Sequence, residues 1–312
     1  MRRLLFPKRG KHYVRGLLIR FGIGLFIALF VVVPVGLTYA IAHPPRFPVC
    51  CFTPADLGLT YETISFPASD GAQLSGWYIP SQNGAAVIMV HANAGNRTGV
   101  IYHADVLAKQ GYGVLLFDVR GFGESAANQF PIPPGGMAED VLGAVAFLQN
   151  RPEVNSDQIG ALGLSMGGMI VLRAAAQTPD IQAVVSDGAA DQGSLSVDDN
   201  PAFAEMPPFM RAYVQFVASI AFRLNGISEQ SLGPRISDVI ANIAPRPILL
   251  ISTATGEEQS DNRLFYSLAG EPKTLWELPD VGHIQGIFAR SEEYHSTILT
   301  FFDDALLQGT QP

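Results

Sequence analysis

Ser165 is the residue of this chain whose surroundings point most directly to chemistry. It is the central residue of Gly163-Leu164-Ser165-Met166-Gly167, a G-x-S-x-G pattern between a predicted strand and a predicted helix. Such a strand-to-helix turn exposes the serine hydroxyl and leaves no room for a side chain at either glycine. The free N–H groups at the start of the helix stabilise developing negative charge. The pattern therefore predicts that Ser165 is a nucleophile.

A serine nucleophile needs a general base, because its free hydroxyl is weakly nucleophilic. The chain has six histidines, and in this arrangement the order along the chain is nucleophile, acid, histidine. Two histidines follow Ser165. His295 falls within a predicted helix, whereas His283 ends the loop Pro279-Asp280-Val281-Gly282-His283. We therefore predict that His283 is the base, and that the earlier His91 holds its own loop by hydrogen bonds.

The acid that orients the base is expected in the segment 253–261, just beyond a predicted strand at 247–252. This segment contains three carboxylates, and the longer side chain of glutamate can act from slightly farther along the turn. We favour Glu258, followed by Glu257 and then Asp261. Asp187, which follows the preceding strand, is a further alternative.

Two backbone N–H groups are expected to bind the oxyanion that forms when a serine attacks a carbonyl. One belongs to Met166, the residue after the nucleophile. The other comes from the loop that follows an early predicted strand at 86–90, and we assign it to Asn93. A metal or cofactor is not expected, because the histidines are scattered and the adjacent Cys50 and Cys51, interpreted as free thiols, lack metal-ligand spacing.

The elements that position these residues follow from short apolar runs that alternate with amphipathic stretches. Strands are predicted at 61–66, 74–79, 86–90, 113–118, 158–164, 183–186, 247–252 and 273–277. Helices are predicted at 97–110, 137–150, 167–177, 261–269 and 292–307. The first two strands flank Ser69-Asp70-Gly71 and form a predicted hairpin. The alternation predicts an α/β fold, with a mostly parallel central sheet and helices on both faces.

One long stretch interrupts this alternation, between the strands predicted at 183–186 and 247–252. Apolar residues recur there at helical spacing: Phe209, Tyr213, Phe216, Val217, Ile220 and Leu224. An insertion at this point of an α/β sheet starts beside the carboxyl ends of the strands, where ligands bind. We therefore predict a helical cap at about 190–245.

The N-terminus has a different composition from the rest of the chain. Residues 1–20 hold seven of the 20 basic residues, and residues 21–42 form an uncharged apolar run long enough to cross a membrane. The basic head is expected to stay in the cytoplasm, which places the α/β domain at 59–312, after a linker at 43–58, on the other side. We favour a signal-anchor; the alternative is a signal peptide cleaved near Ala42.

Charge limits the partners of the main domain. The chain has 312 residues, 48% of them hydrophobic and 15% charged, and a net charge of −8. Its mean hydropathy of +0.22 is raised by the apolar run. Residues 43–312 carry a net charge of −15, so nucleic-acid binding through a basic patch is not expected.

Four segments together resemble the α/β-hydrolase superfamily: VIMVHANAGNR, FDVRGFGES, GALGLSMGG and LPDVGH. Two more, DGAQLSGWYIP and AGEPKTLWELPDVGH, are similar to a bacterial branch of membrane-attached or exported hydrolases, linked to dienelactone hydrolases, esterases and serine peptidases. Two departures stand out. His91-Ala92 replaces the family's His-Gly, and Thr-Gly-Glu-Glu at 255–258 replaces its Gly-x-x-Asp.

The resemblance and the residues agree on a serine hydrolase that cleaves small-molecule carboxylic esters or related acyl bonds through an acyl-enzyme. One alternative is a serine peptidase of the same fold. Another is a non-catalytic scaffold that binds a ligand or partner. The presence of both Ser165 and His283 favours the enzyme.

Overall fold

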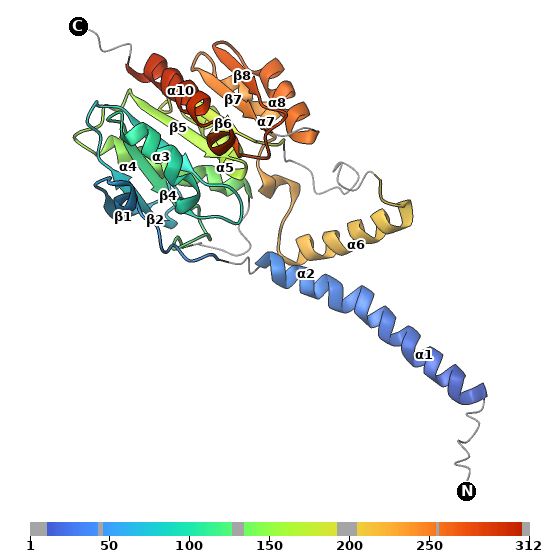
Figure 1. Ribbon diagram of the computed structural model, residues 1–312. Helices are drawn as coiled ribbons and strands as arrows, with labels where there is room; N and C mark the ends of the chain where they lie inside the picture. Colours follow the sequence, from blue (N-terminus) through green and yellow to red (C-terminus); the bar gives the residue numbers. More distant parts are fainter. Residues whose placement is uncertain (1–10, 43–45, 127–133, 192–204, 254–255, 308–312) are drawn as a thin grey trace, which may run out of the picture. The chain divides into compact units, whose positions relative to one another are not determined.

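A computed structural model of the chain describes residues 11–42, 46–126, 134–191, 205–253 and 256–307 (Figure 1). The described residues form two compact units. The first holds residues up to 42 together with 205–228, and the second holds the rest. Half of the predicted basic head, residues 43–45 of the predicted linker and residues 192–204 of the predicted cap lie outside the described residues.

The first unit contains a long apolar helix near the N-terminus. It comprises α1 (Lys11–Ile27), a π-helical turn η1 (Ala28–Val32) and α2 (Val33–Ala42). Its stretch Tyr13–Ala40 is, within the described part of the chain, the one helix long and apolar enough to cross a membrane, with a mean hydropathy of 2.5 in its most apolar part. This finding fits both a signal sequence and an anchor.

The same unit contains α6 (Pro208–Leu224), which packs against α2. Pro208 occupies the first turn of α6, where a missing N–H is harmless. Asn225 and Gly226 end the helix, and Gly226 has the positive φ of 67° that glycine tolerates. Residues 208–224 are thus helical, as their spacing predicts. Their role as a cap stays a prediction.

The second unit is built on an eight-stranded sheet in the order β1-β2-β4-β3-β5-β6-β7-β8. The strands are β1 (Glu62–Pro67), β2 (Gln73–Ile79), β3 (Ala86–Val90), β4 (Gly113–Phe117), β5 (Ile159–Leu164), β6 (Ala183–Asp187), β7 (Ile248–Ser252) and β8 (Lys273–Glu277). β1 and β2 form the predicted hairpin, and β2 pairs antiparallel with β4. All other pairs are parallel. The prediction of a mostly parallel sheet is confirmed.

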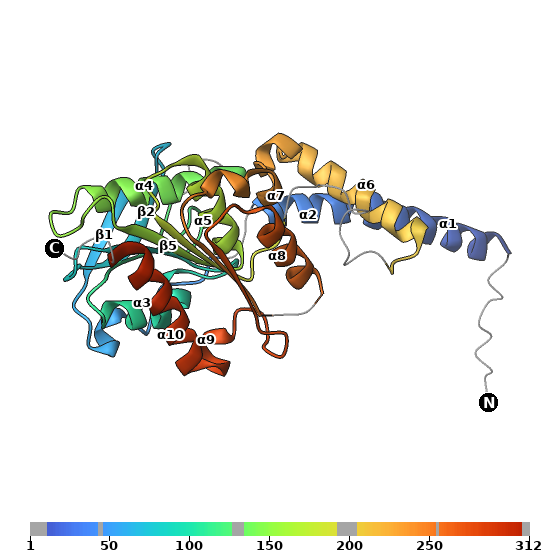
Figure 2. The same cartoon turned by 90° about the horizontal axis from the view of Figure 1, so that it is seen from above.

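Helices cover both faces of this sheet, also as predicted (Figure 2). One hydrophobic cluster joins the sheet to α4 (Ala138–Gln149), α5 (Met166–Gln177) and α8 (Glu257–Leu268). A second joins it to α3 (Ile101–Ala108) and α10 (Ser291–Phe302). Strands β3 to β7 are completely buried, which explains their unbroken apolar sequences.

Shorter helical pieces complete the second unit: η2 (Pro54–Leu57), η3 (Arg97–Val100), η4 (Pro134–Met137), η6 (Glu229–Leu232), α7 (Ile236–Val239), η7 (Ile240–Ile243), α9 (Gly286–Ala289) and η8 (Asp303–Leu307). In α7 and η7, Ile236, Ile240 and Ile243 are fully buried in the core. The last part of the segment predicted as a cap is therefore core of the second unit.

One boundary differs from the expectation in a way that matters for the site. A helix was expected at 261–269 with a loop before it, but α8 already begins at Glu257. The expected loop lacks apolar periodicity, so the pattern does not reveal the first turn. Two acidic residues there, Glu257 and Glu258, favour a helix start through the helix dipole. The candidate acids Glu257, Glu258 and Asp261 therefore lie on a helix.

Candidate active site

Ser165 lies on a strained turn between β5 and α5. Its φ of 52° and ψ of −114° are unusual for a residue with a side chain. The two flanking glycines are sterically required, as the sequence pattern predicts. A Cβ atom at Gly163 would overlap the carbonyl oxygen of Gly167, and one at Gly167 would overlap that of Val90. The turn is held by a 2.7 Å hydrogen bond from the Ser165 N–H to the Asp187 carbonyl.

The structure brings Ser165, His283 and Glu258 into one hydrogen-bonded chain. His283 Nε2 lies 2.9 Å from Ser165 Oγ, and His283 Nδ1 lies 2.6 Å from Glu258 Oε2. A neutral ring with its proton on Nδ1 donates to Glu258 and accepts from the serine hydroxyl. This is the arrangement in which an imidazole can take a proton from Ser165.

The other carboxylates considered for the acid have different surroundings. Asp261 Oδ2 accepts a 2.9 Å hydrogen bond from the Asp191 N–H, so it fixes the chain beyond β6. Asp187 Oδ2 accepts a 2.9 Å hydrogen bond from the Tyr294 hydroxyl in the core. Glu257 lines the pocket described below. Of the four, Glu258 is the carboxylate that is hydrogen-bonded to His283.

Thr253, which follows β7, ties the acid and the base together. Its N–H donates to Glu258 Oε1 at 2.7 Å, and its Oγ1 accepts a 2.7 Å hydrogen bond from the Ile284 N–H. Ile284, directly after His283, has a φ of 52°, a rare conformation for a β-branched residue. The Thr253 contacts thus hold the His283 loop in a conformation that it would not adopt alone. No role for Thr253 in the site was predicted from the sequence. Its position directly after the core strand β7 was the only feature that pointed to one.

Two pKa shifts mark the site. The hydrogen bond to Glu258 holds the pKa of His283 above its ordinary value, although partial burial opposes this. Asp187 is fully buried, and burial raises its pKa to about 7. The negative charge of Glu258, and that of Asp187 when it is ionised, favours the imidazolium form of His283.

The loop between β3 and α3 carries Asn93 and is held by His91, as expected. His91 is buried, and its Nε2 accepts a 3.0 Å hydrogen bond from the Val119 N–H. The ring proton therefore lies on Nδ1, which contacts the Ala92 carbonyl at 2.8 Å. Burial lowers the pKa of His91, so the ring stays neutral. Ala94, with a φ of 54°, completes the sharp turn.

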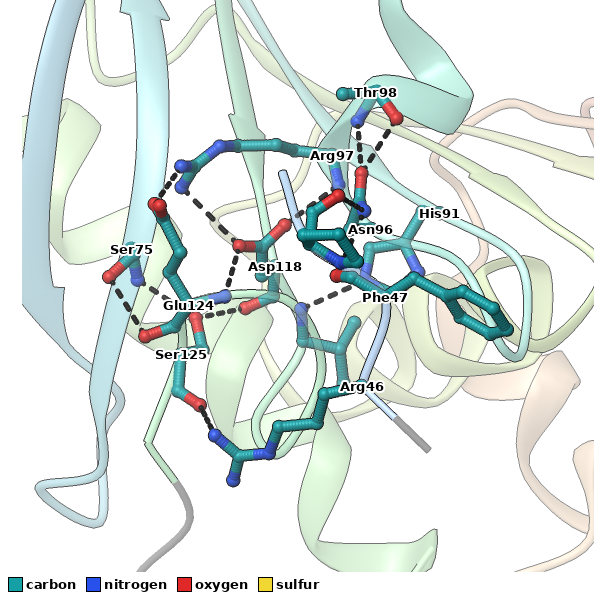
Figure 3. Close-up of polar contacts among 12 residues, drawn as sticks. Arg46, Phe47, Ser75, His91, Asn96, Arg97, Thr98, Asp118, Glu124 and Ser125 are labelled. Carbon is teal, nitrogen blue, oxygen red and sulfur yellow. Dashed lines mark hydrogen bonds and ion pairs between the residues drawn. The ribbon is translucent and has the colours of Figure 1, made fainter. Parts of the chain in front are cut away.

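A polar network supports the same loop (Figure 3). At its centre Asp118 is fully buried. Its Oδ1 accepts from the Arg97 N–H at 2.8 Å, and its Oδ2 accepts from the Glu124 N–H at 2.9 Å. The Arg97 guanidinium pairs with Glu124 and lies 4.7 Å from the centre of the Trp77 ring. Sequence reasoning did not single out these residues, although Asp118 and Glu124 belong to the FDVRGFGES segment.

A pocket of about 610 Å³ opens beside the hydroxyl of Ser165. Its apolar wall consists mainly of flexible methionines and larger hydrophobic side chains: Phe122, Met137, Met166, Met169 and Ile170. The pocket also reaches Asn93, Glu258 and His283. Among the described residues, no group of three or more His, Cys, Asp or Glu side chains could hold a metal ion. Arg173 and Glu257 also line the pocket. The arrangement thus places the Ser165 hydroxyl, hydrogen-bonded to His283, beside a mostly apolar cavity.

Known proteins share sequence and fold with this chain. A family model described as alpha/beta hydrolase fold matches residues 85–235. The uncharacterised protein YfhR of Escherichia coli O157:H7 is 30% identical over 255 residues, which cover 78% of this chain and 81% of that protein.

Solved structures show the same fold. The esterase Pf2001 of Pyrococcus furiosus matches with a TM-score of 0.67 and 24% identity, covering 85% of this chain and 98% of that one. A dienelactone hydrolase from Anabaena variabilis matches with a TM-score of 0.57 and 18% identity, covering 79% and 98%. The chain belongs to the α/β-hydrolase superfamily, and esterases and dienelactone hydrolases are among its structural neighbours.

Proposed function

We propose that this protein is a serine hydrolase that cleaves carboxylic esters or related acyl bonds of small molecules. The observation that carries the proposal is the hydrogen-bonded chain from Ser165 through His283 to Glu258, which opens into an apolar pocket. The esterase among the structural neighbours supports the same reaction class.

Acylation starts when Ser165 Oγ attacks the carbonyl carbon of the substrate while His283 Nε2 takes the serine proton. Glu258 stabilises the imidazolium that forms and keeps the ring in the required tautomer. The N–H groups of Met166 and Asn93 donate to the oxyanion of the tetrahedral intermediate. His283 then gives its proton to the leaving alcohol, and the acyl group stays on Ser165.

Deacylation repeats these roles with water. His283 takes a proton from a water molecule that attacks the acyl carbon, and the same two N–H groups stabilise the second oxyanion. Collapse of this intermediate returns the proton to Ser165 and releases the carboxylic acid.

The proposal is tested by the hydrolysis of a short p-nitrophenyl ester with the full chain in detergent. We expect turnover by the wild-type protein and loss of turnover in Ser165→Ala and in His283→Ala. Equal rates of ester hydrolysis in all three proteins would contradict the proposal.

We propose further that residues 21–42 act as a signal-anchor, with the N-terminus in the cytoplasm and the hydrolase domain outside it. The exposed apolar helix and its basic flank support this orientation. Alkaline carbonate washing of membranes tests the anchor. We expect the chain, with its original N-terminus, in the membrane pellet. A soluble chain that begins after Ala42 would show cleavage instead.

A further inference from the structure

A backbone carbonyl inside the apolar N-terminal helix lacks its usual hydrogen-bond donor. In an α-helix the Leu29 carbonyl accepts from the N–H of Val33, but in the π-helical turn the Val33 N–H donates to the Ala28 carbonyl instead. The next residue, Pro34, has no N–H. An unsatisfied carbonyl is costly in a hydrocarbon environment.

Helix α6 supplies the missing donor. The Tyr213 hydroxyl donates to the Leu29 carbonyl at 2.8 Å. Around this bond, the ring of Phe30 packs against the rings of Tyr213 and Phe216, with centroid distances of 6.0 and 5.8 Å. At the other end of α6, Asn225 Nδ2 donates to the Thr38 carbonyl at 3.1 Å. These contacts lie within the apolar run at 21–42.

The two ends of the α6 insertion lie together in the second unit, as a re-entrant segment requires. The Asp191 carboxylate, just before the insertion, accepts hydrogen bonds from the Ile236 N–H at 2.8 Å and from the Ser237 hydroxyl at 2.5 Å, just after it. The chain therefore leaves and returns at one place. With 17 residues, α6 is about 26 Å long, shorter than the hydrocarbon core.

We propose that α6 is a second membrane-embedded element, a re-entrant helix that packs along the membrane span and contacts lipid acyl chains with its outer face. Three large apolar side chains of α6 remain exposed: Phe209, Phe216 and Leu224, which are 74%, 43% and 65% exposed. They adjoin the apolar surface of the span, which places the same lipid beside both helices.

The polar residues of α6 fit this environment. Its two charged residues, Arg211 and Arg223, lie in its first and last turns, and the stretch 212–222 between them carries no charge. In the middle, Ser219 Oγ donates to the Gln215 carbonyl at 2.6 Å and accepts from Gln215 Nε2 at 3.1 Å. The helix thus satisfies these groups internally, as a lipid environment requires.

Depth-dependent quenching tests this proposal on the full chain in vesicles of phosphatidylethanolamine and phosphatidylglycerol. Cys50 and Cys51 are replaced by serine, and one new cysteine carries an environment-sensitive fluorophore. The test sites are Phe216→Cys and, as a second position on the same face, Phe209→Cys. The matched control is Phe288→Cys on α9, which is 61% exposed in the second unit, and Val31→Cys in the span is the positive control.

We expect nitroxide groups on the lipid acyl chains to quench the labels at 31 and 216 several-fold more than the label at 288. Aqueous iodide should show the opposite order. A label at 216 or 209 that lipid nitroxides quench no more than the label at 288 would overturn the proposal, whether α6 is then in water or packed on protein. An unquenched label at 31 would overturn it too, because α6 needs the span beside it. Hydrolysis of the soluble ester, measured in the same vesicles, reports separately on the proposed function.

Discussion

At the scale of single residues, the proposed mechanism requires Glu258 as the partner of His283. The two groups are 2.6 Å apart, and Glu258 is also fixed by the Thr253 N–H. A carboxylate held from both sides restricts the imidazole to one orientation, which transition-state stabilisation by the ring requires.

Glu258→Gln should lower kcat/KM for a short ester by about 10³–10⁴-fold, because the amide neither stabilises the imidazolium nor fixes the tautomer. Glu257→Gln is the matched control. Glu257 precedes Glu258 on α8 and also lines the pocket, whereas the hydrogen bond to His283 is made by Glu258. We expect only a few-fold effect there. The reverse ranking in steady-state kinetics would assign the acid to Glu257.

The pH dependence follows from the raised pKa of His283. The base must be neutral to accept the serine proton, so kcat/KM should fall as the pH drops through this pKa. Since the shift is upward, the acidic limb of the wild-type profile should lie above the ordinary histidine value of about 6.5. In Glu258→Gln the largest cause of the shift is gone, so the limb of the residual activity should move to lower pH. An unchanged limb would contradict the assignment.

At the scale of elements, the turn between β5 and α5 positions the nucleophile. It requires close backbone contact of Gly163 with α5 and of Gly167 with β3. The turn at Ser165 therefore needs β5, α5 and β3 to meet with glycine, and no larger side chain, at positions 163 and 167.

Gly163→Ala should destabilise the folded protein by about 3 kcal/mol or more, because the new Cβ would overlap backbone that cannot move aside. Gly99→Ala is the control, as its nearest contact would be an ordinary 4.0 Å. Denaturant unfolding of both variants checks this. Equal midpoints would show that the turn has more room than the structure indicates.

Asp187, at the end of β6, links the sheet to Tyr294 on α10 and gives stability a pH dependence. Its pKa is about 7 in the fold but about 4 in the unfolded chain. Between these values the unfolded state binds fewer protons, so stability falls as the pH rises. Asp187→Asn should lack this loss, with a gain over wild type of up to about 4 kcal/mol above pH 7 that disappears near pH 4. Denaturant midpoints that differ by the same amount at both pH values would exclude this origin.

At the scale of the whole molecule, an acidic domain with the α/β-hydrolase fold is joined to a basic, apolar N-terminal segment. The net charge of −15 over residues 43–312 disfavours polyanionic substrates and suits neutral or cationic ones. Raising the ionic strength should therefore change kcat/KM for a neutral ester very little, but should lower it for a cationic ester. Rates for both esters across a salt series check this, and identical salt responses would contradict it.

Much of the fold could be predicted because its buried parallel strands are continuous apolar runs, and the turn at Ser165 carries its own glycine signature. The acid could only be narrowed to a few carboxylates. The choice depends on where α8 begins and how it is rotated, and neither is visible in a segment without apolar periodicity. For α6 the spacing of Phe209, Tyr213 and Phe216 indicates a helix with an apolar face. What packs against that face depends on the π-helical turn η1 in the N-terminal helix, and no sequence pattern predicts that turn.

Labelling with a fluorophosphonate probe, followed by mass spectrometry of the modified peptide, tests the central claim most directly. The probe reacts with a serine hydroxyl activated by a neighbouring base. For the full wild-type chain we predict one adduct, on Ser165, whose formation slows in His283→Ala and stops in Ser165→Ala. Labelling that persists in Ser165→Ala, or no labelling of the folded wild-type protein, would contradict the account.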